Sequence, residues 1–181
     1  PSIKTRIMVN GKRDGWDDFM TDMENADSHL ERVETKYYEP MIVYFSSGTT
    51  GNPKMAMHAH TYALAHLTTA KYWHDVNADS IHLTIADTGW GKAVWGKLYG
   101  EMFMESCVFV YDYDKFHASE ILSILEKYKI TSLCCPPTMF RFMLQEDVSS
   151  YDLSSLKYCT IAGEALNPDV FNKWYEETGI K

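Results

Sequence analysis

The sequence predicts an α/β fold, a mainly parallel β-sheet flanked by helices, and two observations support this prediction. From residue 40 onward, short apolar runs alternate with amphipathic segments of helical periodicity. The segments between successive runs are long enough to hold a helix, as the crossover between parallel strands requires. Ligands of such sheets bind at the carboxyl ends of the strands, so we expect the unusual loops that follow strands to form the site.

Short apolar runs bounded by turn residues mark the expected strands. The first main run is partly β-branched and lies between Pro40 and Ser46, and an earlier strand-like segment covers residues 5–9. Another run ends at Pro136, and proline cannot continue a central strand. The five main strands are expected over residues 41–45, 81–85, 107–111, 130–135 and 156–161.

Helices are expected between these runs. Asn167 ahead of Pro168 predicts the start of the last helix, and Gly179 predicts its end. The other expected helices cover residues 59–73, 93–104, 120–128 and 138–145. Their core candidates include apolar residues at helical spacing, namely Leu64, Leu67, Tyr72, Ile121, Leu122, Leu125 and Tyr128.

The composition is typical of a globular domain. The 181 residues carry 17 basic and 25 acidic side chains, a formal net charge of −8, and 45% are hydrophobic. This acidity excludes a general nucleic-acid binder, no apolar run approaches the roughly 20 residues that span a bilayer, and no secretory signal is visible. We therefore expect a cytoplasmic protein without nucleic-acid or membrane partners. Its cysteines, Cys107, Cys134, Cys135 and Cys159, are expected to be buried free thiols.

The two ends of the chain predict a piece of a longer protein. The sequence starts with Pro1 rather than Met, and it stops after a helix-like segment where a further strand is expected. Residues 1–35 are acidic and less periodic, so we expect a connecting segment of helix and loops there. Residues 36–181 would then form part of a larger α/β domain.

The most informative segment runs from Tyr44 to Lys54 and contains four Ser/Thr hydroxyls, two glycines and a terminal lysine. Glycines let backbone N–H groups approach an anion closely, hydroxyls donate hydrogen bonds, and lysine adds a point charge. The segment is not a Walker A loop, because Gly48 and Gly51 are too close together and no Ser or Thr follows Lys54. It predicts a phosphate-binding loop, and a flexible polar hairpin or linker is the alternative.

Acidic residues avoid this part of the chain. None occurs between Pro40 and His74, where the average of the chain would give about five. The same stretch holds Lys54, Lys71 and four of the seven histidines. An acidic protein that binds a polyanion must keep its carboxylates away from that site. The alternative explanation is that a buried strand and helix simply lack charge.

His58 and His60 invite a zinc interpretation that the sequence does not support. Residues two apart share a face only in a strand, and neither a cysteine nor an acidic residue lies nearby to complete a ligand set. We expect polar packing at the start of a helix and no metal site.

The loop closely resembles the signature of adenylate-forming enzymes, the superfamily of acyl-CoA synthetases, luciferases and peptide-synthetase adenylation domains. Residues 87–90 (Asp-Thr-Gly-Trp) resemble the family segment whose aromatic residue borders the carboxylate substrate. Residues 163–168 (Gly-Glu-Ala-Leu-Asn-Pro) resemble the adenine-contacting turn, and residues 135–138 (Cys-Pro-Pro-Thr) resemble the strand end beside the acyl pocket. The first two segments are most similar to the acetyl- and medium-chain acyl-CoA synthetase branch.

The resemblance covers residues 36–181 and implies an ATP-dependent acid–thiol ligase. A carboxylic acid attacks the α-phosphorus of ATP to give an acyl-adenylate and pyrophosphate, and coenzyme A then displaces AMP. No protein nucleophile is implied, so catalysis rests on positioning and charge stabilisation. Trp90 and Thr138 would border the acyl group. The adenine would lie against Gly163, Glu164 and Ala165. The departing phosphates would be held by Ser46, Ser47, Gly48, Thr49, Thr50, Gly51 and Lys54.

Family parts that the resemblance places beyond Lys181 include a Glu that helps to hold Mg²⁺, an Asp that holds the ribose and a lysine of a small C-terminal domain. We therefore expect the parent protein to be an enzyme and the isolated chain to be inactive. Three alternatives stay open: an adenylating enzyme for aryl or amino acids, another nucleotide-dependent enzyme such as a kinase, and a non-catalytic phosphate-binding module. The sequence determines neither the length of the acyl chain nor the oligomeric state.

Overall fold

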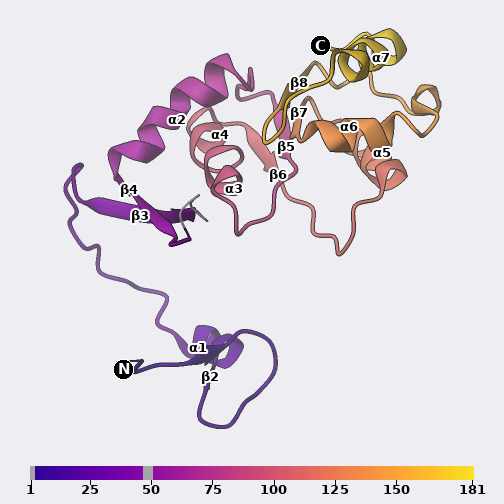
Figure 1. The fold of residues 1–181 in the computed structure, drawn as a ribbon. Helices are drawn as coiled ribbons and strands as arrows, with labels where there is room; N and C mark the ends of the chain where they lie inside the picture. The colour runs from indigo at the N-terminus through magenta and orange to yellow at the C-terminus, as the bar shows by residue number, and fades with distance from the viewer. Residues whose placement is uncertain (1–2, 47–50) are drawn as a thin grey trace. The chain divides into compact units, whose positions relative to one another are not determined.

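The computed structural model describes residues 3–46 and 51–181, so Ser47, Gly48, Thr49 and Thr50 lie outside the described residues. The chain divides into two compact units, Pro1–Thr35 and Lys36–Lys181. Figure 1 shows the elements of both units, and each unit is described here by itself. The described residues contain no helix that is both long and apolar enough to cross a membrane.

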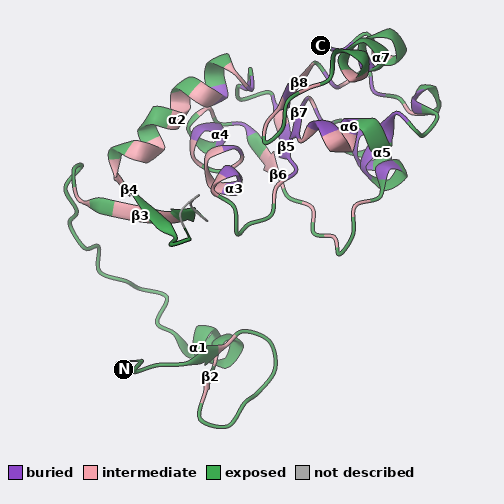
Figure 2. Ribbon diagram, viewed as in Figure 1, coloured by how far each residue is buried: buried purple, intermediate pink, exposed green. Residues whose placement is uncertain are grey.

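The first unit is small and exposed. It pairs β1 (Ile7–Met8) with β2 (Asp17–Asp18) in parallel and continues into α1 (Phe19–Asn25). Asp18 begins this helix as its N-cap, since its Oδ1 accepts a hydrogen bond from the Thr21 N–H over 3.0 Å. None of residues 3–35 is buried, and Figure 2 shows this unit almost entirely in green. The strand expected over residues 5–9 is only two residues long, Ile7–Met8.

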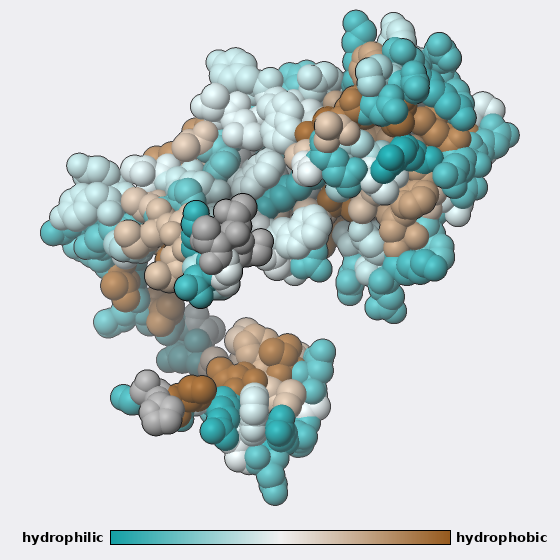
Figure 3. All heavy atoms as spheres, in the orientation of Figure 1, coloured by the Kyte–Doolittle hydropathy of each residue, from teal (hydrophilic) through white to brown (hydrophobic). Residues whose placement is uncertain are grey.

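The second unit begins with an antiparallel hairpin of β3 (Pro40–Ser46) and β4 (Lys54–Ala59). The strand expected over residues 41–45 is confirmed, whereas β4 was not expected. The helix expected from residue 59 begins later, as α2 (Thr61–Tyr72). Val43 pairs with Met57 in this ladder. Apolar side chains gather at the surface over the hairpin in Figure 3, in keeping with the 64% exposure of Met57.

Four strands of the described part of the chain form the parallel sheet that the sequence predicts. They are β5 (Ile81–Thr84), β6 (Cys107–Phe109), β7 (Ser132–Cys135) and β8 (Tyr158–Ile161), in the order β6-β5-β7-β8. All three neighbouring pairs are parallel. Each strand lies within its expected range and is shorter by one or two residues. The predicted fold class is therefore confirmed.

The helix expected over residues 93–104 is instead two short helices, α3 (Gly91–Trp95) and α4 (Tyr99–Phe103). The break has a physical cause in the Gly96 carbonyl, which accepts hydrogen bonds from the side chains of Thr84 and His82 on β5. Because this carbonyl accepts hydrogen bonds from side chains of β5, it does not accept the backbone N–H bond that would continue the helix.

The remaining helices follow the sequence closely. They are α5 (Ala118–Lys127), α6 (Pro137–Met143), a 3₁₀ turn at Val148–Ser150 and α7 (Pro168–Thr178). The expected caps of α7 are confirmed, since the Asn167 side chain accepts from the Asp169 N–H and Gly179 adopts a left-handed φ of 71°.

The parallel sheet has one apolar face and one polar face, and Figure 1 shows it between α2–α4 and α5–α7. On the apolar face, Leu83, Leu133 and Cys135 join the core formed with α5, α6 and α7. Alternate residues point to the opposite face, because strand side chains have a period of two. These alternate residues are His82, Thr84, Ser132, Cys134 and Thr160, all buried.

The prediction of core positions is wrong for three residues. Leu64 and Tyr72 on α2 are exposed, because α2 packs on α4 through another residue, Ala70. The packing is close, since a Cβ built on Gly100 would lie 2.8 Å from the Cβ of Ala70. Tyr128 is also exposed, whereas Ile121, Leu122 and Leu125 are buried as predicted, and Leu67 is half-buried.

The cysteines divide in the same way. Cys134 and Cys135 are buried free thiols, as predicted, and Cys159 is half-buried. Cys107 is exposed, because it opens the edge strand β6 and not a central strand.

Candidate functional site

Three loops that the sequence singles out follow adjacent strands of the parallel sheet. Residues 87–90 follow β5, residues 136–138 follow β7 and residues 163–168 follow β8. Because carboxyl ends of parallel strands share one edge, these loops occupy the place where α/β sheets bind ligands. One side-chain contact confirms that two of them meet: Thr138 Oγ1 donates to Glu164 Oε2 over 2.6 Å.

Arg141 completes a small polar network at this edge. It lies one helical turn after Thr138 on α6, and its Nη2 donates to Thr138 Oγ1 over 2.7 Å. Its guanidinium is also 3.9 Å from Glu164 Oε2, and the two charged side chains are 55% and 46% exposed. The sequence interpretation did not include Arg141, although its position three residues after Thr138 on a helix was a usable signal.

The turn at residues 87–90 is closed by its own aspartate. Asp87 Oδ1 accepts from the Gly89 N–H over 2.6 Å, and the Trp90 N–H donates to the Asp87 carbonyl over 3.0 Å. Trp90 then caps α3 and is 63% exposed, so it is not a core aromatic residue. The first residue of α3 lies near the hairpin, because a Cβ built on Gly91 would be 3.4 Å from the Tyr44 ring.

The hairpin corrects one expectation about the phosphate loop. Among the described residues, β3 pairs with β4 and not with the parallel sheet, so the strand before the loop is not one of the strands of that sheet. Ser46 and Lys54 are paired opposite each other at the described ends of the two strands, and Gly51 has a φ of 91° that favours glycine. The phosphate-binding role of Ser46, Gly51 and Lys54 stays a prediction.

The segment predicted to contact adenine is an open turn. Gly163 has a φ of 98°, and a Cβ there would meet no atom of the described residues within 4 Å. Glu164 and Ala165 are exposed beside it. The turn therefore presents backbone and a carboxylate to solvent, beside Thr138.

Aromatic side chains join the hairpin to α2. The ring centroids of His58 and Tyr62 are 4.1 Å apart, and Tyr62 also contacts Tyr44 edge-on. Burial raises the pKa of Tyr44 well above its ordinary value, with a further contribution from the Tyr62 hydroxyl, so Tyr44 stays protonated. His60 precedes the first residue of α2 as its N-cap.

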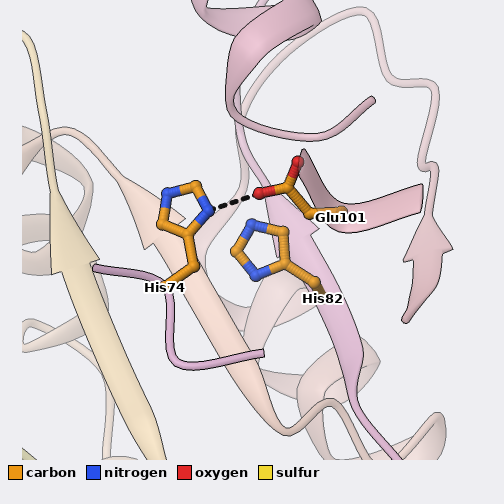
Figure 4. A group of neighbouring side chains, drawn as sticks. All are labelled: His74, His82 and Glu101. Atoms are coloured by element: carbon orange, nitrogen blue, oxygen red, sulfur yellow. Dashed lines mark hydrogen bonds and ion pairs between the residues drawn. The ribbon is translucent and has the colours of Figure 1, made fainter. Parts of the chain in front are cut away.

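A buried cluster of His74, His82 and Glu101 was missed by the sequence interpretation. Figure 4 shows the three side chains converging, and all are fully buried. His74 Nδ1 donates to Glu101 Oε1 over 2.5 Å, and the two imidazole rings stack 4.5 Å apart. Histidine inside the apolar strand run at residues 81–85 was the signal that could have found it.

Within this cluster His82 is not free to bind a metal ion, whereas His74 Nε2 and Glu101 Oε2 have no hydrogen-bond partner among the described residues. Both ring nitrogens of His82 are engaged, Nδ1 with Ser132 Oγ at 2.9 Å and Nε2 with Thr84 Oγ1 at 2.7 Å. Burial lowers the pKa of His82 to about 3, and the positive charges of His74 and Lys92 contribute. Burial opposes the charged form of His74, but its hydrogen bonds with Cys134 and Glu101 outweigh that effect and raise its pKa. The cluster is therefore a hydrogen-bonded charge network.

Comparisons with known proteins identify the family. A family model described as AMP-binding enzyme matches residues 2–181. The chain belongs to the AMP-binding enzyme family. This membership confirms the resemblance to adenylate-forming enzymes that the motifs indicate.

The most similar relatives include named acyl-CoA synthetases. The chain is 39% identical to human acyl-coenzyme A synthetase ACSM5, mitochondrial, over all of this chain and 31% of that protein. It is 37% identical to rat acyl-coenzyme A synthetase ACSM4, mitochondrial, over all of this chain and 32% of that protein. The chain therefore spans about a third of the length of the curated relatives it matches.

Solved structures share the fold. The anthranilate CoA ligase AuaEII, solved with anthranoyl-AMP, superposes with a TM-score of 0.84 at 26% identity, over 97% of this chain and 34% of that chain. An acyl-CoA synthetase from Brucella canis gives a TM-score of 0.85 at 24% identity, over 94% of this chain and 31% of that chain.

Proposed function

We propose that the whole protein is an AMP-forming acyl-CoA synthetase, which activates a carboxylic acid with ATP and transfers the acyl group to coenzyme A. The observation that supports it best is the 2.6 Å hydrogen bond between Thr138 and Glu164. An acyl-adenylate joins the acid directly to the nucleotide, so an enzyme that makes it must hold both groups side by side. The segment proposed for the acyl group and the turn proposed for adenine meet at this bond.

Each proposed contact has a distinct task. The exposed Trp90 ring forms one wall of the acyl pocket, and Thr138 lies beside the acid. Gly163, Glu164 and Ala165 receive the adenine, and their turn leaves a free backbone edge for a flat base. The phosphates that leave as pyrophosphate are held by Ser46, Ser47, Gly48, Thr49, Thr50, Gly51 and Lys54.

The reaction needs no nucleophile from the protein. The carboxylate oxygen of the acid attacks the α-phosphorus, and the bond to the bridging oxygen of pyrophosphate breaks. These residues lower the barrier by aligning the two reactants and by neutralising charge on the leaving group. The coenzyme A sulfur then attacks the acyl carbon, and AMP leaves.

Mg²⁺ in nucleotide sites is commonly held by one or two carboxylates together with waters and substrate phosphates. Asp87 Oδ1 accepts from the Gly89 N–H, and Glu164 Oε2 accepts from Thr138, so each of these carboxylates keeps a second oxygen. The resemblance assigns the Mg²⁺-binding carboxylate to a residue beyond Lys181. We therefore assign no step to a metal held by these residues.

The acid is proposed to be a medium-chain acid. The Asp-Thr-Gly-Trp and Gly-Glu-Ala-Leu segments resemble the acetyl- and medium-chain branch, and neither relative named above is an acetyl-CoA synthetase. Both relatives are named as mitochondrial, so the expectation of a cytoplasmic protein has no support.

Exchange of labelled pyrophosphate into ATP by the full-length protein tests this function. A panel should contain acetate, straight-chain acids of increasing length, an aromatic acid such as anthranilate, and amino acids. We expect exchange that depends on medium-chain acids, followed by thioester formation when coenzyme A is added. Exchange with amino acids alone, or no exchange with any acid, would contradict the proposal.

A further inference from the structure

Arg141 reaches the candidate site without belonging to any of the segments assigned to substrate. It lies on α6, behind Thr138, and its Nη2 donates to Thr138 Oγ1 over 2.7 Å. The guanidinium is 3.9 Å from Glu164 Oε2, which is too long for a direct hydrogen bond. Arg141 therefore acts on Glu164 chiefly through the hydroxyl of Thr138.

The Thr138 hydroxyl is fixed from both sides. It has one proton, which it gives to the Glu164 carboxylate, and it accepts the guanidinium proton with a lone pair. Both bonds involve a charged group, and such hydrogen bonds are shorter and stronger than neutral ones. The chain Arg141–Thr138–Glu164 consequently links the strand end after β7 to the turn after β8.

We infer that Arg141 is a positioning residue, which holds Thr138 and Glu164 in register so that acid and nucleotide bind as a coupled pair. This inference rests on the proposed function. Arg141 does not touch the reacting atoms. The planar guanidinium of Arg141 suits this positioning role, because its N–H donors have a fixed geometry that a lysine ammonium group lacks.

A second exposed ion pair, between Lys129 and Asp152, lies away from the candidate site and provides a control. Lys129 Nζ donates to Asp152 Oδ2 over 2.7 Å, and these side chains are 55% and 50% exposed. Lys129 precedes β7 and Asp152 precedes β8, so this pair joins the same two strands at the opposite, amino edge of the sheet. The Lys129–Asp152 pair is about as exposed as Arg141 and Glu164, and it also joins the segments of β7 and β8. It differs from them because it lies at the edge of the sheet opposite the candidate site.

The test uses the full-length protein and five variants: Arg141→Gln, Thr138→Val, the double variant Arg141→Gln/Thr138→Val, Thr138→Ser, and Lys129→Gln as the matched control. Acid-dependent pyrophosphate exchange gives kcat and the KM values for ATP and for acid, and thermal unfolding gives Tm. We expect Arg141→Gln to raise both KM values, about five- to tenfold for ATP, at an unchanged Tm. Lys129→Gln should leave both KM values within about twofold of those of the wild-type protein.

The double variant decides whether Arg141 acts through Thr138. If it does, Arg141→Gln causes no further loss once Thr138 is Val, whereas Thr138→Ser keeps the hydroxyl and restores KM values close to wild type. Independent, additive losses, or an Arg141→Gln variant that behaves like Lys129→Gln, would overturn this inference alone. No acid-dependent exchange by the wild-type protein would overturn the proposed function and this inference with it.

Discussion

His74 donates a hydrogen bond to Glu101 across 2.5 Å, and neither side chain has any exposed surface. The pair joins the loop after α2 to α4, underneath the polar face of the sheet. Removal of one partner from a buried ion pair lowers the free energy of unfolding strongly, because the charge of the other partner is left buried and uncompensated.

Removal of the Glu101 carboxylate should therefore destabilise the protein strongly. We expect Glu101→Ala to lower the free energy of unfolding by about 3–5 kcal/mol, measured by urea denaturation. Asp152→Ala breaks the exposed pair with Lys129 and should lower the free energy of unfolding much less, because solvent screens an exposed pair. Equal losses in the two variants would show that the buried pair contributes no more than a surface pair.

His82 should make the protein sensitive to acid. Burial lowers its pKa to about 3 in the folded protein, whereas an unfolded histidine binds a proton near pH 6.5. Between these two values the unfolded state holds more protons, so stability falls as pH decreases, by up to about 1.4 kcal/mol per pH unit.

The variant His82→Gln should flatten the dependence of stability on pH between about 6 and 4, measured by urea denaturation at each pH. Its control is His29→Gln, which changes an exposed histidine of the first unit. His74 acts with the opposite sign, because its raised pKa stabilises the fold at low pH and that contribution is lost as pH rises. An unchanged slope in His82→Gln would contradict the assignment to His82.

Gly100 should tolerate no side chain. A Cβ at this position would lie 2.2 Å from the His66 carbonyl oxygen, which is backbone and cannot move aside cheaply. We expect Gly100→Ala to destabilise the packing of α4 on α2 by roughly 1–3 kcal/mol. Gly91→Ala is the matched change, since its nearest neighbour is the movable Tyr44 ring at 3.4 Å, and its Tm should stay close to wild type.

Lys54 should contribute to the use of ATP by the full-length protein. A charge-assisted contact to phosphate is worth about 1.5–3 kcal/mol, so Lys54→Ala should weaken ATP use about ten- to a hundredfold with little change in KM for acid. Lys71→Ala removes another exposed cation from the same acid-free stretch and serves as control. An unchanged exchange rate in Lys54→Ala would remove this residue from the site.

Trp90 should influence which acids react. Because its ring is 63% exposed, Trp90→Ala should leave Tm nearly unchanged and alter the ranking of straight-chain acids in the exchange assay. Trp90→Phe keeps an aromatic wall and should preserve that ranking. Equal loss for all acids, together with a lower Tm, would assign a structural role to Trp90.

Features that depend on neighbouring residues could be predicted from the amino-acid sequence. Apolar runs predicted the four described parallel strands, and Asn167, Pro168 and Gly179 predicted the limits of α7. Both predictions succeed because strand periodicity and helix caps depend on a few consecutive residues. The Tyr44–Lys54 motif indicated the family for the same reason, since its residue types and spacing are continuous in the chain.

Only the tertiary structure decided which distant residues meet. The split between α3 and α4 depends on bonds from β5 to the Gly96 carbonyl, and the contact between Thr138 and Glu164 depends on β7 and β8 being neighbours. The polar face of the sheet likewise follows from strand order and register. Pattern within a segment predicts its local form. Partners at least 12 residues apart are brought together by strand order and packing, and at Gly96 also by the need to satisfy buried polar groups.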